Sequence, residues 1–151
     1  SPVTAASYDP SKLVELPNTY DYVKKHGLYL PEGLIAYRPS DPADVHKVGA
    51  FFVEFPPTVP VLVVVTAVPD SNSAEIVWST KSTNLKTGLG PFFRPITASR
   101  VGNVLEWTNY SEEFTYEFKW ADKDSGTLGI STSKSTSNNT AKPGRFVRLD
   151  G

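Results

Sequence analysis

The chain contains only two histidines, and imidazole is the side chain best suited to acid–base chemistry near neutral pH. With Asp44 close by, His46 could act as a general base or as a metal ligand. Both His26 and His46 also fall at the C-terminal ends of short predicted helices, where a partly charged imidazole complements the helix dipole. We expect this structural role for both histidines.

Other routes to catalysis have little support in the sequence. The chain has no cysteine, no His-Glu-x-x-His, no Gly-x-Ser-x-Gly and no glycine-rich loop of the phosphate-binding type. Acidic pairs such as Glu112 and Glu113 leave no spacing signature, so a small hydrolase or isomerase on a β scaffold stays a lower-ranked alternative. We expect no catalytic residues.

The segment Asp122–Gly126 places carboxylates at alternate positions, as the start of a calcium loop does. The twelfth position from Asp122 is Ser133, where such a loop needs a closing glutamate. Aspartate and glycine between two strands are also ordinary hairpin residues. We therefore expect no metal site and no cofactor.

Aromatic residues near predicted strand ends are the best candidates for binding. Flat rings at a loop rim can stack on sugar rings, and neighbouring Asn and Asp side chains can accept hydrogen bonds from hydroxyl groups. The alternative is that the rings belong to the core, since one-sided alternation is typical of a buried face. The predicted ligand-binding residues are Trp107, Asn109, Tyr110, Trp120 and Asp122.

The longest apolar run, Val59–Val68, indicates a central strand between two proline-containing turns. A strand that is apolar on both faces must be covered on both faces. We expect the remaining strands to supply that cover as a second sheet.

The other strands follow at short spacing. Phe114–Trp120 alternates aromatic and polar residues, as expected of an antiparallel strand with one buried face. Gly102-Asn103 between two apolar stretches predicts a hairpin. The pattern predicts a mainly β fold, an antiparallel two-sheet β-sandwich (jelly-roll-like) of about eight strands. The further strands are expected at 51–55, 75–79, 92–101, 104–108, 127–131 and 145–149.

A short helical preface precedes the strands. Asn18 is placed to cap a helix that ends at His26, and Gly27 follows it in the position of a left-handed exit. Asp41-Pro42 predicts one further helical turn. We expect residues 1–8 to form a flexible arm or linker, and residues 9–151 to form a single β-sandwich domain with the helical preface at 9–49.

Charge and composition limit the partners. The net charge is −1, from 15 basic and 16 acidic residues spread along the chain, so we expect no nucleic-acid partner. No apolar run approaches the ~20 residues of a membrane helix, so we expect no membrane insertion. Without methionine, the chain is expected to be a processed form or a fragment. Lack of cysteine leaves the compartment undetermined, with an extracellular or virion surface favoured.

These features favour recognition without catalysis, by an attachment or assembly module that presents loops on a rigid β scaffold. A surface (projecting) domain of a viral coat protein is one form of such a module, and a carbohydrate-binding, lectin-like module is the alternative. The expected partners are a glycan or protein receptor, or copies of the chain itself in a homodimer. Sequons at 109–111 and 138–140 matter only if the chain is secreted.

Overall fold

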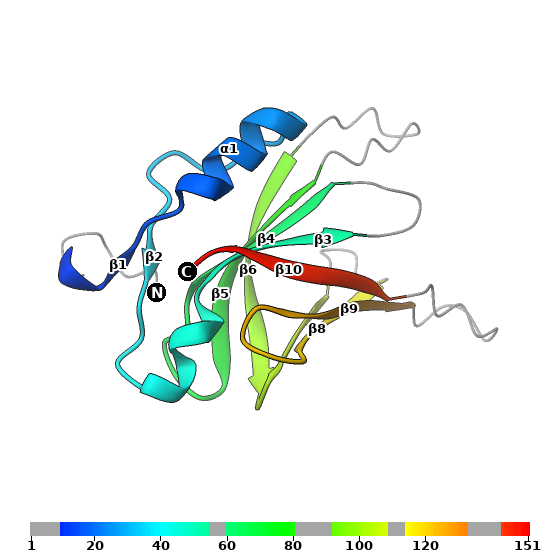
Figure 1. The fold of residues 1–151 in the computed structure, drawn as a ribbon. Coiled ribbons are helices and arrows are strands. Elements are labelled where there is room, and N and C mark those ends of the chain that lie inside the picture. The colour runs from blue at the N-terminus through cyan, green and yellow to red at the C-terminus, as the bar shows by residue number, and fades with distance from the viewer. Residues whose placement is uncertain (1–9, 55–59, 81–91, 109–113, 133–142) are drawn as a thin grey trace.

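The computed structural model describes residues 10–54, 60–80, 92–108, 114–132 and 143–151 (Figure 1). The fold is mainly β and antiparallel, as the sequence predicted, with eight strands in its main sheet. In chain order these are β3 Gly49–Glu54, β4 Val61–Ala67, β5 Ser73–Thr80, β6 Phe92–Val101, β7 Val104–Thr108, β8 Phe114–Trp120, β9 Ser125–Thr132 and β10 Gly144–Asp150.

The main sheet closes into a barrel, which corrects the expected two-sheet sandwich. Each strand from β3 to β9 pairs with the next along the chain, and β10 then pairs with both β9 and β3. Closure removes the two free edges that an open sheet would expose. Periodicity fixes which side chains share a face but does not distinguish a sheet that closes on itself from one that packs against another.

The strand β4 is covered on both faces, as its composition requires. Val63 points into the barrel, and its neighbours Leu62 and Val64 point outward, yet all three are fully buried. The outer cover comes from the N-terminal segment, because β2 (Ala36–Tyr37) packs against β4 and the buried Leu28 belongs to the same cluster. The expected second layer is therefore a strap of N-terminal residues outside the barrel, which contains a small two-stranded sheet, and not the second sheet of a sandwich (Figure 1).

The strap also carries the α-helix α1, Pro17–His26, which ends at Gly27 with φ 66°, the left-handed exit that the sequence predicted. Its N-terminus is capped differently from the expectation, because Asn18 lies inside the helix. The Asp150 carboxylate on β10 accepts hydrogen bonds from the Thr19 amide at 2.6 Å and from the Asn18 amide at 3.3 Å. A residue 131 positions away in sequence thus supplies the cap and ties the strap to the barrel.

One end of the barrel is closed by η3, a 3₁₀ helix at Pro42–Lys47, with Asp41 as its cap. The Arg148 guanidinium anchors it by donating to the His46 and Val48 carbonyl oxygens. We call this the η3 end and the opposite one the far end. The short elements η2 (Pro10–Lys12) and β1 (Leu13–Val14) complete the strap, with β1 paired to β2.

The barrel interior near the η3 end is filled with aromatic and aliphatic side chains. Phe118 and Phe146 stack with ring centroids 3.9 Å apart, and Phe51 contacts both edge-on. All three are fully buried. An eight-stranded barrel has an interior just wide enough to be filled in this way. None of the helices in the described ranges has the length and apolarity needed to cross a membrane.

Candidate binding site

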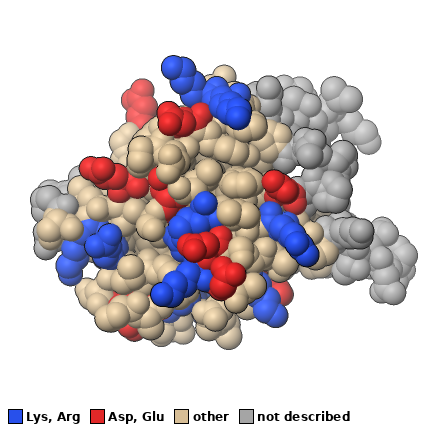
Figure 2. All heavy atoms as spheres, viewed as in Figure 1, with Lys and Arg blue, Asp and Glu red and all other residues tan. Residues whose placement is uncertain are grey.

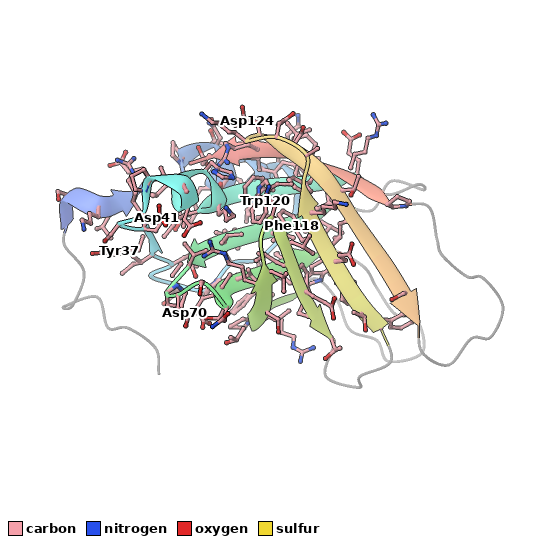
Figure 3. The ribbon with its side chains drawn as sticks, turned by 90° about the horizontal axis from the view of Figure 1, so that it is seen from below. Tyr37, Asp41, Asp70, Phe118, Trp120 and Asp124 are labelled. Carbon is pink, nitrogen blue, oxygen red and sulfur yellow. The ribbon has the colours of Figure 1, made fainter. Side chains whose placement is uncertain are left out.

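A cleft of about 560 Å³ lies at the η3 end, between the segment that joins β2 to η3 and the turn that joins β4 to β5. Tyr37 and Asp41 lie on one side and Asp70 on the other (Figure 3). The cleft is within the size range of small-molecule sites, which runs from about 300 to 1,000 Å³. Its lining residues are Tyr37, Pro39, Ser40, Asp41, Asp44, Ala67, Val68, Pro69, Asp70, Ser71 and Arg100.

Hydrogen bonds within their own turns hold two of the cleft carboxylates in place. Asp41 Oδ1 accepts a hydrogen bond from the Ala43 amide at 2.9 Å, the capping bond of η3. Asp70 Oδ1 accepts from the Asn72 amide at 2.7 Å and from Ser73 Oγ at 3.1 Å, which forms the turn into β5. The Asn72 amide, followed by the Ser73 hydroxyl, lowers the pKa of Asp70 and keeps it ionised.

Arg100, near the end of β6, brings a guanidinium to the same cleft. Its Nη1 donates to the Asp70 carbonyl oxygen at 2.9 Å and its Nη2 pairs with Asp44, which also pairs with Lys47 at 3.3 Å. The Arg100 side chain is only 9% exposed. Its Nε is buried and has no hydrogen-bond partner among the residues that the structure describes. The guanidinium is thus held rigidly, with one donor left unsatisfied.

The charges in the cleft nearly balance. Three aspartates face one arginine, and Lys47 behind Asp44 offsets a second carboxylate. A free anion would meet an excess of carboxylates, and a small cation would meet Arg100. Groups that both donate and accept hydrogen bonds suit this surface best. On the face shown in Figure 2, basic and acidic side chains are interspersed and neither sign forms a broad patch.

The structure places the two predicted tryptophans inside the barrel. Trp107 and Trp120 are each 4% exposed and belong to the core cluster. Trp120 lies at the η3 end, with its ring edge-on to His46 at 6.3 Å, whereas Trp107 lies toward the far end and stacks on Tyr116 at 5.6 Å. The two indoles therefore occupy different levels of the interior, and neither lines the cleft.

Asp122 is exposed in the turn between β8 and β9. Its carboxylate accepts from the Asp124 and Ser125 amides, both at 2.8 Å, and from Ser125 Oγ at 2.9 Å. The first of these amides, and then the Ser125 hydroxyl, lowers its pKa. The remaining predicted residues, Asn109 and Tyr110, lie outside the described residues. The role of this set in binding stays a prediction.

The Asp44 carboxylate and the His46 ring are not hydrogen-bonded to each other in the described part of the chain. The Asp44 carboxylate is engaged by Arg100 and Lys47, while His46 faces Trp120. Burial, followed by the charges of Lys47 and Arg148, lowers the pKa of His46. Within the described ranges no three His, Asp or Glu side chains gather as a metal site would require. The pair Glu112 and Glu113 lies outside those ranges.

Sequence reasoning missed the cleft although its parts were visible. Asp41-Pro42 predicts a helix start, and Asp70 falls in the proline-containing turn that follows the apolar run Val59–Val68, so each has a local role. Arg100 carries no motif at all. Tertiary contacts bring these residues together: pairing of β5 with β6 places Arg100 beside the turn that carries Asp70, and Arg100 reaches Asp44 across 56 positions.

Comparison of the chain with protein-family models, with curated proteins and with solved structures finds no match. The function is therefore inferred from the geometry of the described residues.

Proposed function

We propose that this protein is a non-catalytic recognition module that binds a neutral saccharide unit in the cleft at the η3 end. The observation that carries the proposal is the composition of that cleft. It combines carboxylates fixed by their own turns, a rigid guanidinium and a wall of one tyrosine ring and two prolines. Among the roles expected from the sequence, this is the carbohydrate-binding one.

Sugar chemistry matches both parts of the cleft. Every sugar hydroxyl is a donor and an acceptor, so it can donate to a carboxylate and accept from a guanidinium. A carboxylate has about four lone-pair positions, so the turn bonds of Asp41 leave it capacity to accept from a ligand. The C–H face of a sugar ring is apolar and packs against flat side chains. Tyr37, Pro39 and Pro69 provide such a wall.

Binding is favoured over acid catalysis by the state of the carboxylates. A general acid at neutral pH needs a raised pKa. The turn bonds of Asp70 lower its pKa, and Asp44 is held in an ion pair with Arg100. Ionised Asp70 is suited to accepting hydrogen bonds and unsuited to donating a proton to a leaving group, and the Asp44 carboxylate is already engaged by Arg100.

A glycan array on the intact chain, followed by calorimetric titration of any sugar that binds, tests the proposal. The decisive variant is Asp70→Asn, which replaces one acceptor oxygen by a donor at the cleft. Asp122→Asn is its matched control, because Asp122 makes the same kind of turn with a serine three positions later but lies outside the cleft. We expect Asp70→Asn to weaken binding at least about tenfold, the effect of losing one charge-assisted hydrogen bond.

The same pair of variants separates the cleft from the site predicted by sequence. Loss of binding in Asp122→Asn with normal binding in Asp70→Asn would place the sugar at the β8–β9 turn. Equal affinity in both variants, or no glycan bound at all, would contradict a saccharide site in the cleft.

The assembly role expected from the sequence, with the surface domain of a viral coat protein as one form, makes a different prediction. Light scattering over a concentration series would then show a dimer or larger oligomer, because assembly requires contacts between copies. A monomer at every concentration, combined with glycan binding, would favour the free lectin-like module.

A further inference from the structure

The cleft at the η3 end lies between two parts of the chain that belong to different elements. One side, which we call the strap wall, consists of residues 39–41 and of Asp44 on η3. The other side, the turn wall, consists of residues 67–71, which lead from β4 to β5. A ligand that contacts both walls binds better when their separation is already fixed, because less conformational freedom is then lost on binding.

Arg100 is attached to the turn wall by two hydrogen bonds. Its backbone amide donates to the Asn72 carbonyl oxygen at 2.8 Å, and its Nη1 donates to the Asp70 carbonyl oxygen at 2.9 Å. The first bond involves the backbone of Arg100 and the second its side chain. Arg100 and the turn wall therefore form one unit.

The same guanidinium also reaches the strap wall. Its Nη2 pairs with the Asp44 carboxylate, 56 positions away in sequence. The two side chains are only 9% and 14% exposed, so salt and water screen the pair less than they screen a surface ion pair. Because the guanidinium is planar, the positions of Nη1 and Nη2 relative to each other are fixed. One rigid group thus joins the two walls.

The carboxylates that are open to a ligand are each ordered within their own wall. Asp41 caps η3 on the strap wall, and Asp70 bonds to the Asn72 amide on the turn wall (Figure 3). These bonds fix the direction of each carboxylate but not the separation of the two. The contact of Arg100 with Asp44 joins the walls directly and can set that separation.

We infer, on the basis of the proposed saccharide site, that Arg100 is a positioning residue of the cleft. It holds the strap wall and the turn wall at the separation at which Asp41 and Asp70 contact one sugar unit together. The contacts with the ligand are then made by Asp41 and Asp70, and Arg100 acts through them.

Arg100→Met removes the link between the walls without leaving a carboxylate unpaired. Asp44 keeps its ion pair with Lys47 at 3.3 Å. The substitution also removes Nε of Arg100, a buried donor that has no partner among the residues that the structure describes. We therefore expect this variant to fold, which near-UV circular dichroism checks.

The wall separation can be measured without any ligand. The chain has no cysteine, so Ala43→Cys on η3 and Ser71→Cys on the turn wall can carry a unique pair of spin labels. Both positions are exposed. We expect double electron–electron resonance to give a narrow distance distribution when Arg100 is present. In Arg100→Met the distribution should be broader or shifted.

Titration of a sugar that binds the wild type measures the consequence for affinity. We expect Arg100→Met to weaken binding about tenfold, because the ligand must then order the walls itself. Arg100→Lys keeps the charge without the planar fork, so its distances and its affinity should both be intermediate. Arg38→Met is the control, since Arg38 is exposed and does not line the cleft, and it should change neither quantity.

Two results would overturn the inference. An unchanged distance distribution in folded Arg100→Met would show that the walls keep their separation without the guanidinium. A broadened distribution with wild-type affinity would show that the separation does not govern binding. Arg100→Lys supplies the same two measurements if Arg100→Met does not fold. If no sugar binds the wild type, the saccharide proposal fails, while the distance measurement still decides whether Arg100 sets the separation of the walls.

Discussion

The two halves of the barrel interior use similar aromatic side chains to different ends. In the η3 half, Phe51, Phe118 and Phe146 pack against one another, stacked or edge-to-face, and all three are fully buried. They lie under η3, which Arg148 anchors through the His46 carbonyl oxygen. In the far half, Trp78 and Tyr116 face the same interior but retain exposure. The comparison shows that inward orientation alone does not make a side chain part of the core.

The largest expected effect is a difference in unfolding free energy between a substitution in the η3 half and one in the far half. Phe118→Ala should lower the free energy of unfolding by about 3–5 kcal/mol, because the stacked Phe146 cannot fill the space. Tyr116→Ala should cost roughly half as much, since its side chain is partly exposed already. Urea unfolding measures both. Equal losses in the two variants would mean that both halves are equally packed.

The next effect concerns the anchoring of η3 to the barrel by Arg148. Arg148→Met should lower the free energy of unfolding by about 2–3 kcal/mol, since it leaves the His46 and Val48 carbonyl oxygens without their donor. It also removes the guanidinium from above the Phe51 ring, 4.7 Å from its centroid. Arg145→Met on the same strand is exposed and should stay within about 0.5 kcal/mol of the wild type. A similar loss in both would refute the anchoring role of Arg148.

A smaller effect tests the tight turns at the η3 end. Gly102, between β6 and β7, has φ 58° and open space where a Cβ would lie, so Gly102→Ala introduces backbone strain without a clash. It should destabilise the fold by about 1–2 kcal/mol. Gly129→Ala on β9 also meets open space and should be neutral or stabilising. Thermal unfolding of both variants provides the measurement, and an unchanged midpoint for Gly102→Ala would show that this turn relaxes.

The smallest expected effect is a pH dependence of the stability, which comes from His46 in η3. Because the folded pKa of His46 is lowered, the unfolded chain binds the proton more readily as the pH falls. The stabilising contribution of His46 is therefore present above its unfolded pKa, about 6.5, and is lost as the pH falls through its folded pKa. Urea midpoints between pH 8 and pH 5 should fall less steeply for His46→Gln than for the wild type. If the urea midpoints of the two proteins changed in parallel with pH, the lowered pKa of His46 in the folded state would be contradicted.

Local sequence patterns predicted the strands of the barrel well. The expected ranges 92–101, 104–108 and 114–120 match β6, β7 and β8, because alternation and turn residues act over a few positions. The one-sided face of β8 does point inward, from Phe118 to Trp120. The candidate site was predicted far less well, since its carboxylates and guanidinium come from three separate segments.

The sequence by itself determined the elements: period-two alternation set the inward faces, Gly27 ended α1, and Asp41 capped η3. Only the tertiary structure decided closure, because pairing of β10 with β3 depends on contacts between distant residues that no local pattern encodes. The same long-range contacts made the strap, and not the second sheet of a sandwich, the outer cover of β4. They also made Asp150 the cap of α1 and brought Asp70 and Arg100 into one cleft. Apolar surface requires burial but does not specify its partner, and the partner is chosen only when the whole chain folds.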